Sequence, residues 1–254
     1  MQDNWQFIVL IILLRYVIVA GIAYLTWYVL KRRAWSYKKI QVKFPQNKDY
    51  LREITYSLVT IIIFTTVAMT LFSPWVKPHT LIYDNIPTLG IAYFILSIVM
   101  IIFVHDTYFY WMHRLMHHKK LYRITHLVHH KSTNPSPWAA FAFHPIEAFI
   151  EAGIIILTVF LFPVHKLAIA LFLIFMIIYN VYGHLGYELY PKGFYKHWLG
   201  KWLNTSVNHN MHHEYVKGNY GLYFTFWDRL MGTIHMGYEA RFDEVKNRIT
   251  NKNQ

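Results

Sequence analysis

Residues 105–130, HDTYFYWMHRLMHHKKLYRITHLVHH, hold seven of the 16 histidines of this 254-residue chain. Two sets of spaced histidines follow one another there: an HxxxH pair at His113 and His117, and an HxxHH triplet at His126, His129 and His130. Because residues three or four apart share one face of an α-helix, each set can direct two or three imidazoles at one point. This spacing predicts helices that bind a metal.

The triplet spacing returns far downstream in HNMHHEY, at His209, His212 and His213. A single HxxHH is weak evidence, since paired histidines also occur on solvated surfaces. Two copies and an HxxxH pair in an apolar chain are more specific, because so many buried neutral imidazoles need a metal or hydrogen-bond partners. The alternative is a set of interfacial or core histidines that bind backbone groups.

The composition is that of a membrane protein. Hydrophobic residues make up 55% of the chain and aromatic residues 19%, and the mean hydropathy is +0.23. The absence of cysteine excludes thiolate-bound zinc, iron–sulfur clusters, thiolate haem and disulfides, so a metal must be held by histidine and carboxylate. The formal charge of +12 lies beside apolar runs, which favours orientation signals and anionic-lipid contacts over nucleic-acid binding.

Apolar runs predict an all-α integral membrane protein with four to five helices that span or enter the bilayer. A hydrocarbon core of ~30 Å needs about 20 apolar residues. The runs are 7–30, 56–72, 88–104, 149–162 and 167–182. The run 149–162 is short, so residues 149–182 form a hairpin that either crosses the bilayer or only enters it.

Charges predict the orientation of these helices. Eight lysines and arginines lie between residues 31 and 52, opposed only by Asp49 and Glu53, which places this loop in the cytoplasm. The N-terminus is then outside, and the third span brings His105 to the cytoplasmic boundary, where we expect a helical cap that holds the histidine motifs. Arg15 lies inside the first span and either binds a carboxylate, a carbonyl or water, or extends to the membrane surface.

The number of imidazoles indicates two metal ions. The HxxxH pair and the two triplets supply eight, whereas zinc takes four ligands in structural sites and three with a water in catalytic sites. A histidine-rich site without thiolates suits non-haem iron, and zinc could also occupy it. Two irons can use O2 to oxidise an unactivated C–H bond, for which an apolar lipid is a natural substrate.

Several motifs together resemble the fatty acid hydroxylase / sterol desaturase superfamily, from about residue 105 to 237. These motifs are HD…YWMHR, the two HxxHH triplets, FHPIE at 143–147, HLGYE at 184–188, NYG at 219–221 and WDRLMGT at 227–233. The resemblance implies a mostly helical membrane enzyme with a dinuclear iron centre at the cytoplasmic surface. Such an enzyme hydroxylates or desaturates a fatty acyl, sterol-like or other lipid with O2 and externally supplied electrons.

The resemblance also implies the metal ligands. Carried over residue by residue, they are His113, His117, His126, His129, His130, His184, His209, His212 and His213. No catalytic residue separate from the metal centre is expected. The implied organisation is a region of membrane helices with a basic loop (1–87), a catalytic domain (88–238) and a polar tail (239–254).

Two residues near the first motif have different expected roles. Asp106 falls nearly on the helical stripe of His113 and His117, so we expect its carboxylate to orient a ligand imidazole. His105 points about a quarter-turn away from that stripe. It is either a further ligand or an interfacial hydrogen-bonding residue.

Three further residues have open roles. Glu188 stands where some relatives have a second histidine, and it either ligates the metal, orients His184 or caps a helix. His144 precedes a proline and either fixes a loop near the site or starts a helix. Asp228 either holds a ligand imidazole or pairs with Arg229.

The electrons must come from another molecule, because the chain has no cysteine for a cluster, no HPGG motif and no GxGxxG turn. A ferredoxin, a b-type cytochrome or a reduced pterin would serve.

The alternative function is a membrane zinc hydrolase that acts on lipid amides or esters. Dependence of the activity on O2 and a reductant distinguishes the two.

Overall fold

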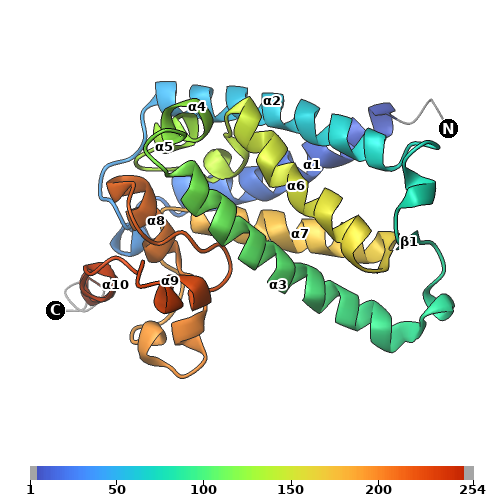
Figure 1. Ribbon diagram of the computed structural model, residues 1–254. Coiled ribbons are helices and arrows are strands. Elements are labelled where there is room, and N and C mark those ends of the chain that lie inside the picture. The colour runs from blue at the N-terminus through green and yellow to red at the C-terminus, as the bar shows by residue number, and fades with distance from the viewer. Residues whose placement is uncertain (1–4, 249–254) are drawn as a thin grey trace.

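The computed structural model describes residues 5–248 as a bundle of long helices with a helical cap at one end (Figure 1). The long helices are α1 (Trp5–Ala23), which continues as a π-helical segment (Tyr24–Leu30), α2 (Asn47–Leu71), α3 (Gly90–Met116), α6 (Pro145–Leu161) and α7 (Lys166–Gly183). The cap contains the short helices α4 (Tyr122–Thr125), α5 (Leu127–His130), α8 (Ser206–Tyr215), α9 (Phe226–Leu230) and α10 (Tyr238–Asn247).

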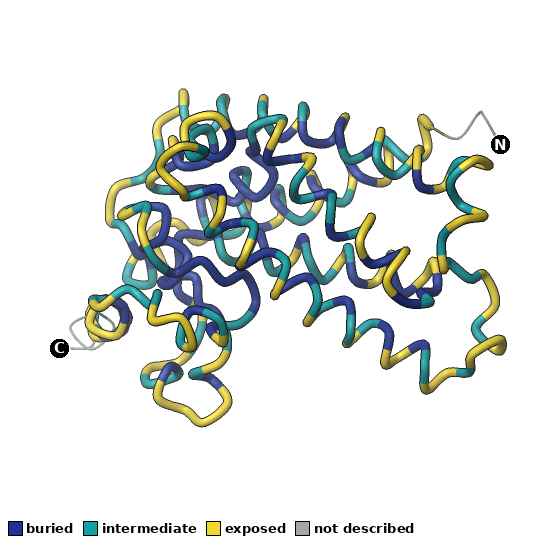
Figure 2. Tube along the Cα trace, in the orientation of Figure 1, coloured by how far each residue is buried: buried dark blue, intermediate teal, exposed yellow. Residues whose placement is uncertain are grey.

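The bundle confirms the predicted all-α membrane fold. Segments Trp5–Leu30, Asn47–Leu71, Gly90–Met116 and Lys166–Gly183 are long and apolar enough to cross a membrane, and α6 is a shorter fifth helix of 17 residues. Large hydrophobic side chains such as Phe7, Ile62 and Ile91 are more than 60% exposed on the bundle's surface. Alternation of buried and exposed positions along these helices is visible in Figure 2. Outward-facing apolar side chains of this kind contact lipid.

Two of the long helices extend past the predicted apolar runs, for local reasons. Helix α2 begins at Asn47 because Gln46 and Asp49 form a capping box, in which the Gln46 backbone N–H donates to Asp49 Oδ2 at 2.9 Å. Helix α3 continues beyond residue 104 to Met116 without a break. His113 therefore lies in the cap but belongs to the same continuous helix as the apolar residues of the bundle.

A short parallel pair of strands joins two loops at the end of the bundle opposite the cap. Strand β1 (Ile82–Tyr83) pairs with β2 (Val164–His165), with Ile82 opposite Val164. The pairing ties the loop after α2 to the turn between α6 and α7. Strands of two residues are too short for an alternating pattern to reveal them in the sequence.

The segment expected as a polar tail from residue 239 forms helix α10 instead, and residues 249–254 lie outside the described residues. Phe242 and Val245 are fully buried and pack with Ile40, Val207 and Met211. Most residues of the segment are polar, so its overall composition does not reveal this periodic apolar face. Helix α10 thus fastens the basic loop and α8 to each other.

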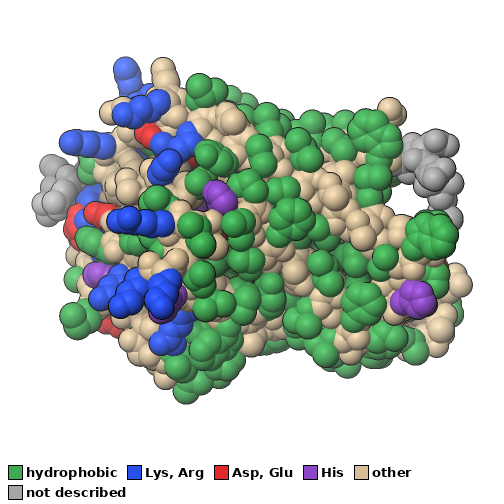
Figure 3. Space-filling view, turned by 45° about the horizontal axis from the view of Figure 1, so that its top comes forward, with side chains coloured by type: hydrophobic (Ala, Val, Ile, Leu, Met, Phe, Trp, Pro, Cys, Tyr) green, Lys and Arg blue, Asp and Glu red, His purple; other side chains and the backbone are tan. Residues whose placement is uncertain are grey.

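The basic loop lies at the same end as the histidines. Gln41 Nε2 donates to the Thr133 carbonyl at 2.8 Å and to Asn210 Oδ1 at 3.0 Å, so the loop touches segments on both sides of the cap. In Figure 3, lysine and arginine side chains gather at the left end, and hydrophobic side chains cover most of the rest of the visible face.

We predict that Phe242→Ala destabilises the cap. Truncating a fully buried phenylalanine costs about 3–5 kcal/mol, because a cavity remains where the ring packed. The thermal unfolding midpoint of the detergent-solubilised protein should fall well below that of the wild type. Met236→Ala, at a position that is 101% exposed, is the control and should leave the midpoint unchanged. Equal midpoints for the two variants would contradict the packing role of α10.

Candidate metal centre

Four segments that are distant in sequence bring imidazoles to one place in the cap. The end of α3 supplies His113 and His117, and the α4–α5 segment supplies His126, His129 and His130. The C-terminal end of α7 supplies His184, and α8 supplies His209, His212 and His213. Most residues of helix α8 are polar, yet residues 206–213 are all buried. Its N-terminus is capped by the Thr205 hydroxyl, which accepts the Asn208 N–H at 3.1 Å.

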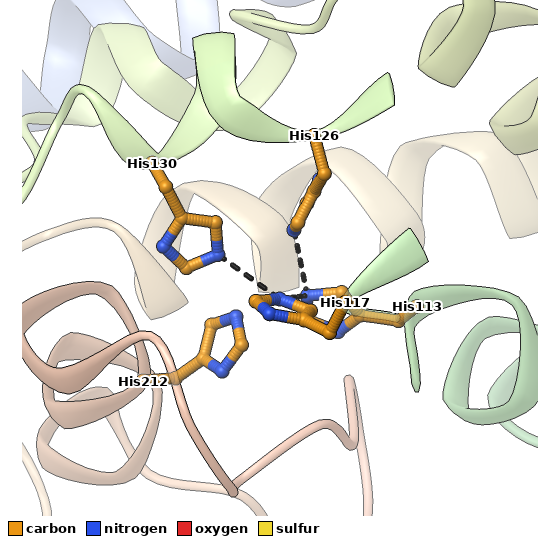
Figure 4. A group of neighbouring side chains, drawn as sticks. All are labelled: His113, His117, His126, His130 and His212. Carbon is orange, nitrogen blue, oxygen red and sulfur yellow. Dashed lines mark hydrogen bonds between the residues drawn. The ribbon is translucent and has the colours of Figure 1, made fainter. Parts of the chain in front are cut away.

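The first group contains one imidazole nitrogen from each of five histidines within 4.8 Å of one another: His113, His117, His126, His130 and His212. The Nε2 atoms of His113 and His126 are 3.0 Å apart, and those of His130 and His117 are 3.2 Å apart. Figure 4 shows the five rings converging from the end of α3, from the α4–α5 segment and from α8.

The second group contains His129, His184, His209 and His213, again within 4.8 Å of one another. Its centre is His184, whose Nε2 lies 3.2 Å from Nε2 of His129 and 3.1 Å from Nε2 of His209 and of His213. The groups adjoin, because His129 and His130 are consecutive and the ring centroids of His130 and His213 are 4.9 Å apart. The structure thus brings all nine sequence-predicted ligands together in two adjacent groups.

The hydrogen bonds fix which ring nitrogen carries the proton. Nδ1 of His113 lies 2.9 Å from the Tyr220 carbonyl oxygen, and Nδ1 of His212 lies 2.7 Å from that of Gly218. Nδ1 of His184 lies 2.7 Å from the Asn180 carbonyl oxygen. Because a carbonyl oxygen only accepts, each Nδ1 must donate, and Nε2 of the neutral ring is left with a lone pair.

His126 is oriented by a carboxyl group instead of a backbone carbonyl. Its Nδ1 lies 2.6 Å from Glu147 Oε1, and both side chains are buried. Burial lowers the pKa of His126 well below its usual value, and the neighbouring imidazoles lower it further, so the ring is neutral. Sequence reasoning did not include Glu147 among the site residues. The available signal was the FHPIE segment, in which proline starts α6 and Glu147 occupies the third helical position.

Converging lone pairs are the strongest indication of a metal. Nε2 of His113 and Nε2 of His212 each carry a lone pair, because each Nδ1 donates to a backbone carbonyl, and the two rings lie in one group with centroids 4.4 Å apart. In addition, Nε2 of the buried His212 has no hydrogen-bond partner among the described residues. These observations fit divalent metal ions and disfavour histidines held by backbone groups alone.

Asp106 and Asp228 lie beside the groups and hold a loop rather than an imidazole. Asp106 Oδ1 accepts the backbone N–H groups of Tyr223 and Phe224 at 2.8 and 3.1 Å. Asp228 accepts those of Tyr220 at 2.9 Å and of Gly221 at 2.7 Å. This loop presents the Tyr220 carbonyl to His113, so both aspartates act on the site through the backbone.

The remaining three candidates also lie outside the two groups. His105 Nδ1 is 2.8 Å from the Tyr223 hydroxyl. His144 is the N-cap of α6, where its ring accepts the Ile146 N–H. Glu188 accepts the Val207 N–H at 3.0 Å in the first turn of α8, as a helix cap would.

A cavity lined mostly by apolar side chains of α1, α2, α3, α6 and α7 lies beside the two histidine groups. Phe109 lines it and lies 4.9 Å, centroid to centroid, from the ring of His113. Phe143 lines it and lies 5.2 Å from the ring of His129. An apolar molecule in this cavity would therefore contact an aromatic ring that itself contacts each group.

A helical membrane bundle whose cap gathers nine imidazoles without a thiolate defines a histidine-box membrane metalloprotein. A model of the fatty acid hydroxylase family matches residues 98–233, and the chain belongs to that family. This membership confirms the resemblance drawn from the motifs. It also confirms the expected class of enzyme, an O2-dependent oxidoreductase that acts on a lipid in the membrane.

Curated relatives are sterol-modifying enzymes. The Delta(7)-sterol 5(6)-desaturase ERG3B of Gibberella zeae is 32% identical over 234 residues, which are 92% of this chain and 68% of that protein. Human lathosterol oxidase is 30% identical over 197 residues, which are 76% of this chain and 64% of the human protein. The chain thus spans about two thirds of the length of these relatives. No solved structure matches it.

We predict that Glu147→Gln weakens metal binding by about 10–100-fold, because partners that orient a ligand imidazole contribute this much to affinity. Metal retained by the purified protein during a chelator titration, measured by elemental analysis, checks this. Glu239→Gln, at an exposed position of α10, is the matched control. Equal retention by the two variants would show that Glu147 does not orient His126 for a metal.

Proposed function

We propose that this protein is a di-iron oxygenase that desaturates or hydroxylates a sterol-like lipid within the membrane. The observation that carries the proposal is the convergence of nine buried imidazoles beside an apolar cavity, with Phe109 and Phe143 between the two. The names of the relatives, which are sterol desaturases and lathosterol oxidases, support the sterol-like class.

The proposed ligands are the two histidine groups, one for each iron: His113, His117, His126, His130 and His212 for the first, and His129, His184, His209 and His213 for the second. Bound iron would supply the O2 chemistry that oxidises an unactivated C–H bond, and zinc is a possible occupant of the same ligands. The chain's own contribution is orientation. Carbonyl oxygens and the Glu147 carboxyl group orient the rings through Nδ1, and the apolar cavity keeps water from the reacting carbon.

A separate protein or small molecule would supply the electrons. The chain contains no cysteine for an iron–sulfur cluster and no motif for a flavin or nicotinamide. A ferredoxin, a b-type cytochrome or a reduced pterin could transfer electrons at the cap, where the basic loop contacts the segments that carry the histidines. In this proposal residues 88–238 form the catalytic unit, and the helices of residues 1–87 complete the cavity.

The cap would face the cytoplasm, with the N-terminus outside. The basic loop of residues 31–52 contacts the histidine segments: Arg52 donates to Ser132 Oγ at 3.1 Å. Since short loops rich in lysine and arginine stay on the cytoplasmic side, the metal centre would stay there as well.

Lipid profiling tests the function. Cells that express the wild type should gain lipids with one additional oxygen or two fewer hydrogens, and the change should need O2. We predict that His129→Ala and His212→Ala abolish this change while the protein remains in the membrane, because each removes a proposed ligand. His118→Ala, an exposed histidine outside both groups, should retain the activity.

Two results would contradict the proposal. Lipid turnover that continues without O2 and a reductant would favour a zinc hydrolase. Near-normal activity of His129→Ala or His212→Ala would remove that histidine from the ligand set.

The orientation is tested with single cysteines, since the chain has none of its own. We predict that a membrane-impermeant maleimide labels Trp75→Cys in intact cells, because Trp75 is 85% exposed in the loop opposite the cap. Arg33→Cys, in the basic loop, should be labelled only after the cytoplasmic face is opened. The reverse pattern would place the metal centre outside the cell.

A further inference from the structure

Large apolar side chains are exposed on the cap as well as on the membrane helices. Five of them lie beyond the last long helix, α7, in the segment 198–202 and in α9: Trp198, Leu199, Trp202, Phe226 and Leu230. Trp198 and Leu230 are more than 60% exposed. We call these five side chains the cap face. Because so much apolar surface is poorly accommodated by water, the cap face needs a partner.

The two segments that form the cap face are held together. The ring centroids of Trp202 and Phe226 are 6.3 Å apart. The backbone N–H of Thr225 donates to the Trp202 carbonyl oxygen at 2.9 Å. Phe226 and Leu230 are four residues apart in α9, so they lie on the same side of that helix. The five side chains therefore belong to one surface and not to two independent loops.

Helix α3 carries exposed residues that lead to this surface. Phe103, Thr107 and Trp111 are exposed and follow one another at intervals of four residues, so they lie on one side of the helix. Trp227 of α9 packs there: its Nε1 donates to the Thr107 hydroxyl at 3.1 Å, and its ring centroid lies 5.5 Å from that of Trp111. Since α3 is long and apolar enough to span the membrane, the outward-facing Phe103 contacts lipid.

A groove joins the lipid-facing side of α3 to the cap face. Phe103 and Thr107 of α3 line it together with Trp202 and Phe226 of the cap. The lining also includes Asp106, whose Oδ1 already accepts two backbone N–H groups. The lipid-exposed surface of the bundle thus continues into the cap without an intervening polar belt. This continuity points to lipid, and not to a separate protein, as the partner of the cap face.

The composition of the cap face is that of a membrane interface. Two of its five side chains are tryptophans, which are enriched where hydrocarbon meets the lipid headgroups. Lys201 Nζ lies 5.0 Å from the centroid of the Trp202 ring. Lys201 takes part in none of the ion pairs formed by residues 5–248. A lysine beside an interfacial aromatic ring can extend its ammonium group to lipid phosphates.

The length of α3 agrees with a cap that enters the membrane. Its 27 residues extend over about 40 Å, whereas the hydrocarbon core is ~30 Å thick and the bilayer with its headgroups about 40–45 Å. Figure 1 shows α3 inclined to α2, which shortens its projection across the membrane. The C-terminal end of α3, with His113 and His117, can then lie among the headgroups.

We propose that the cap face is immersed in the membrane leaflet on the cap side, where phospholipid acyl chains fill the groove between α3 and the cap. The metal centre then lies at the level of the headgroups and not above the membrane. This contact with lipid is independent of the proposed oxygenase function, because it does not depend on the metal that the histidines bind or on the reaction.

Spin labels test the immersion, because the chain has no cysteine and single label sites can be introduced. The full chain carries a nitroxide at Trp198→Cys or Leu230→Cys and is placed, one copy to a disc, in nanodiscs of phosphatidylcholine. Collisions of the label with O2, which concentrates in lipid, are compared with collisions with a water-soluble nickel chelate. We predict that the ratio of O2 to nickel collisions at both sites exceeds severalfold that at Lys217→Cys, an exposed position after α8.

The references define the two environments. Ile95→Cys, which is exposed within the span of α3, should give the high ratio of a lipid-facing label. Circular dichroism and retention of the metal confirm that each labelled variant is folded. If Leu230→Cys does not fold, Trp198→Cys, in a turn outside the helices, carries the test.

Two results would overturn the proposal. A ratio at Trp198→Cys and Leu230→Cys as low as that at Lys217→Cys would place the cap face in water. Labels that are shielded from both O2 and nickel would show that protein covers the cap face instead of lipid. Neither result bears on the oxygenase function, which lipid profiling tests separately.

Discussion

The protein's organisation depends on the orientation of imidazole lone pairs. Backbone carbonyls occupy the Nδ1 protons of His113 and His212, so the Nε2 lone pairs of these two neighbouring rings lie in one group. Such an arrangement is unfavourable without a cation and favourable with one. A polar helix such as α8 can be buried in the cap because its histidines converge on a site of this kind.

The membrane bundle and the cap are joined by a continuous helix. Helix α3 runs unbroken from the lipid-facing bundle to His113. The position of the bundle in the membrane therefore fixes the position of His113 and His117. Phe109 and Phe143 line the cavity between the helices, and each contacts a histidine ring of one of the two groups. The cavity and the histidine groups therefore share these two aromatic side chains as a common wall.

The sequence predicts what depends on local spacing. Apolar runs located the long helices, and the HxxxH and HxxHH motifs located eight of the nine histidines that the structure gathers. The ninth, His184, followed from the family resemblance. Contacts between distant segments could not be read in this way. The bond from Glu147 to His126, the anchoring of a loop by Asp106 and the joint presence of Arg15 and Glu151 in one cavity arise only when α1, α3 and α6 pack. Helix α10 was missed because its buried face is only a few residues within a polar segment.

The loop that orients His113 has a consequence for biosynthesis. The Tyr220 carbonyl that binds this imidazole lies 107 positions later in the chain, and Asp228 holds it in place. Because a polypeptide leaves the ribosome from its N-terminus, His113 emerges without this partner and remains so until that loop has been translated and folded, whereas Glu147 follows His126 by only 21 residues. Metal binding that uses all of the first histidine group would thereby wait until residues 220–228 have folded, which would limit the time in which an incomplete site could bind the wrong ion.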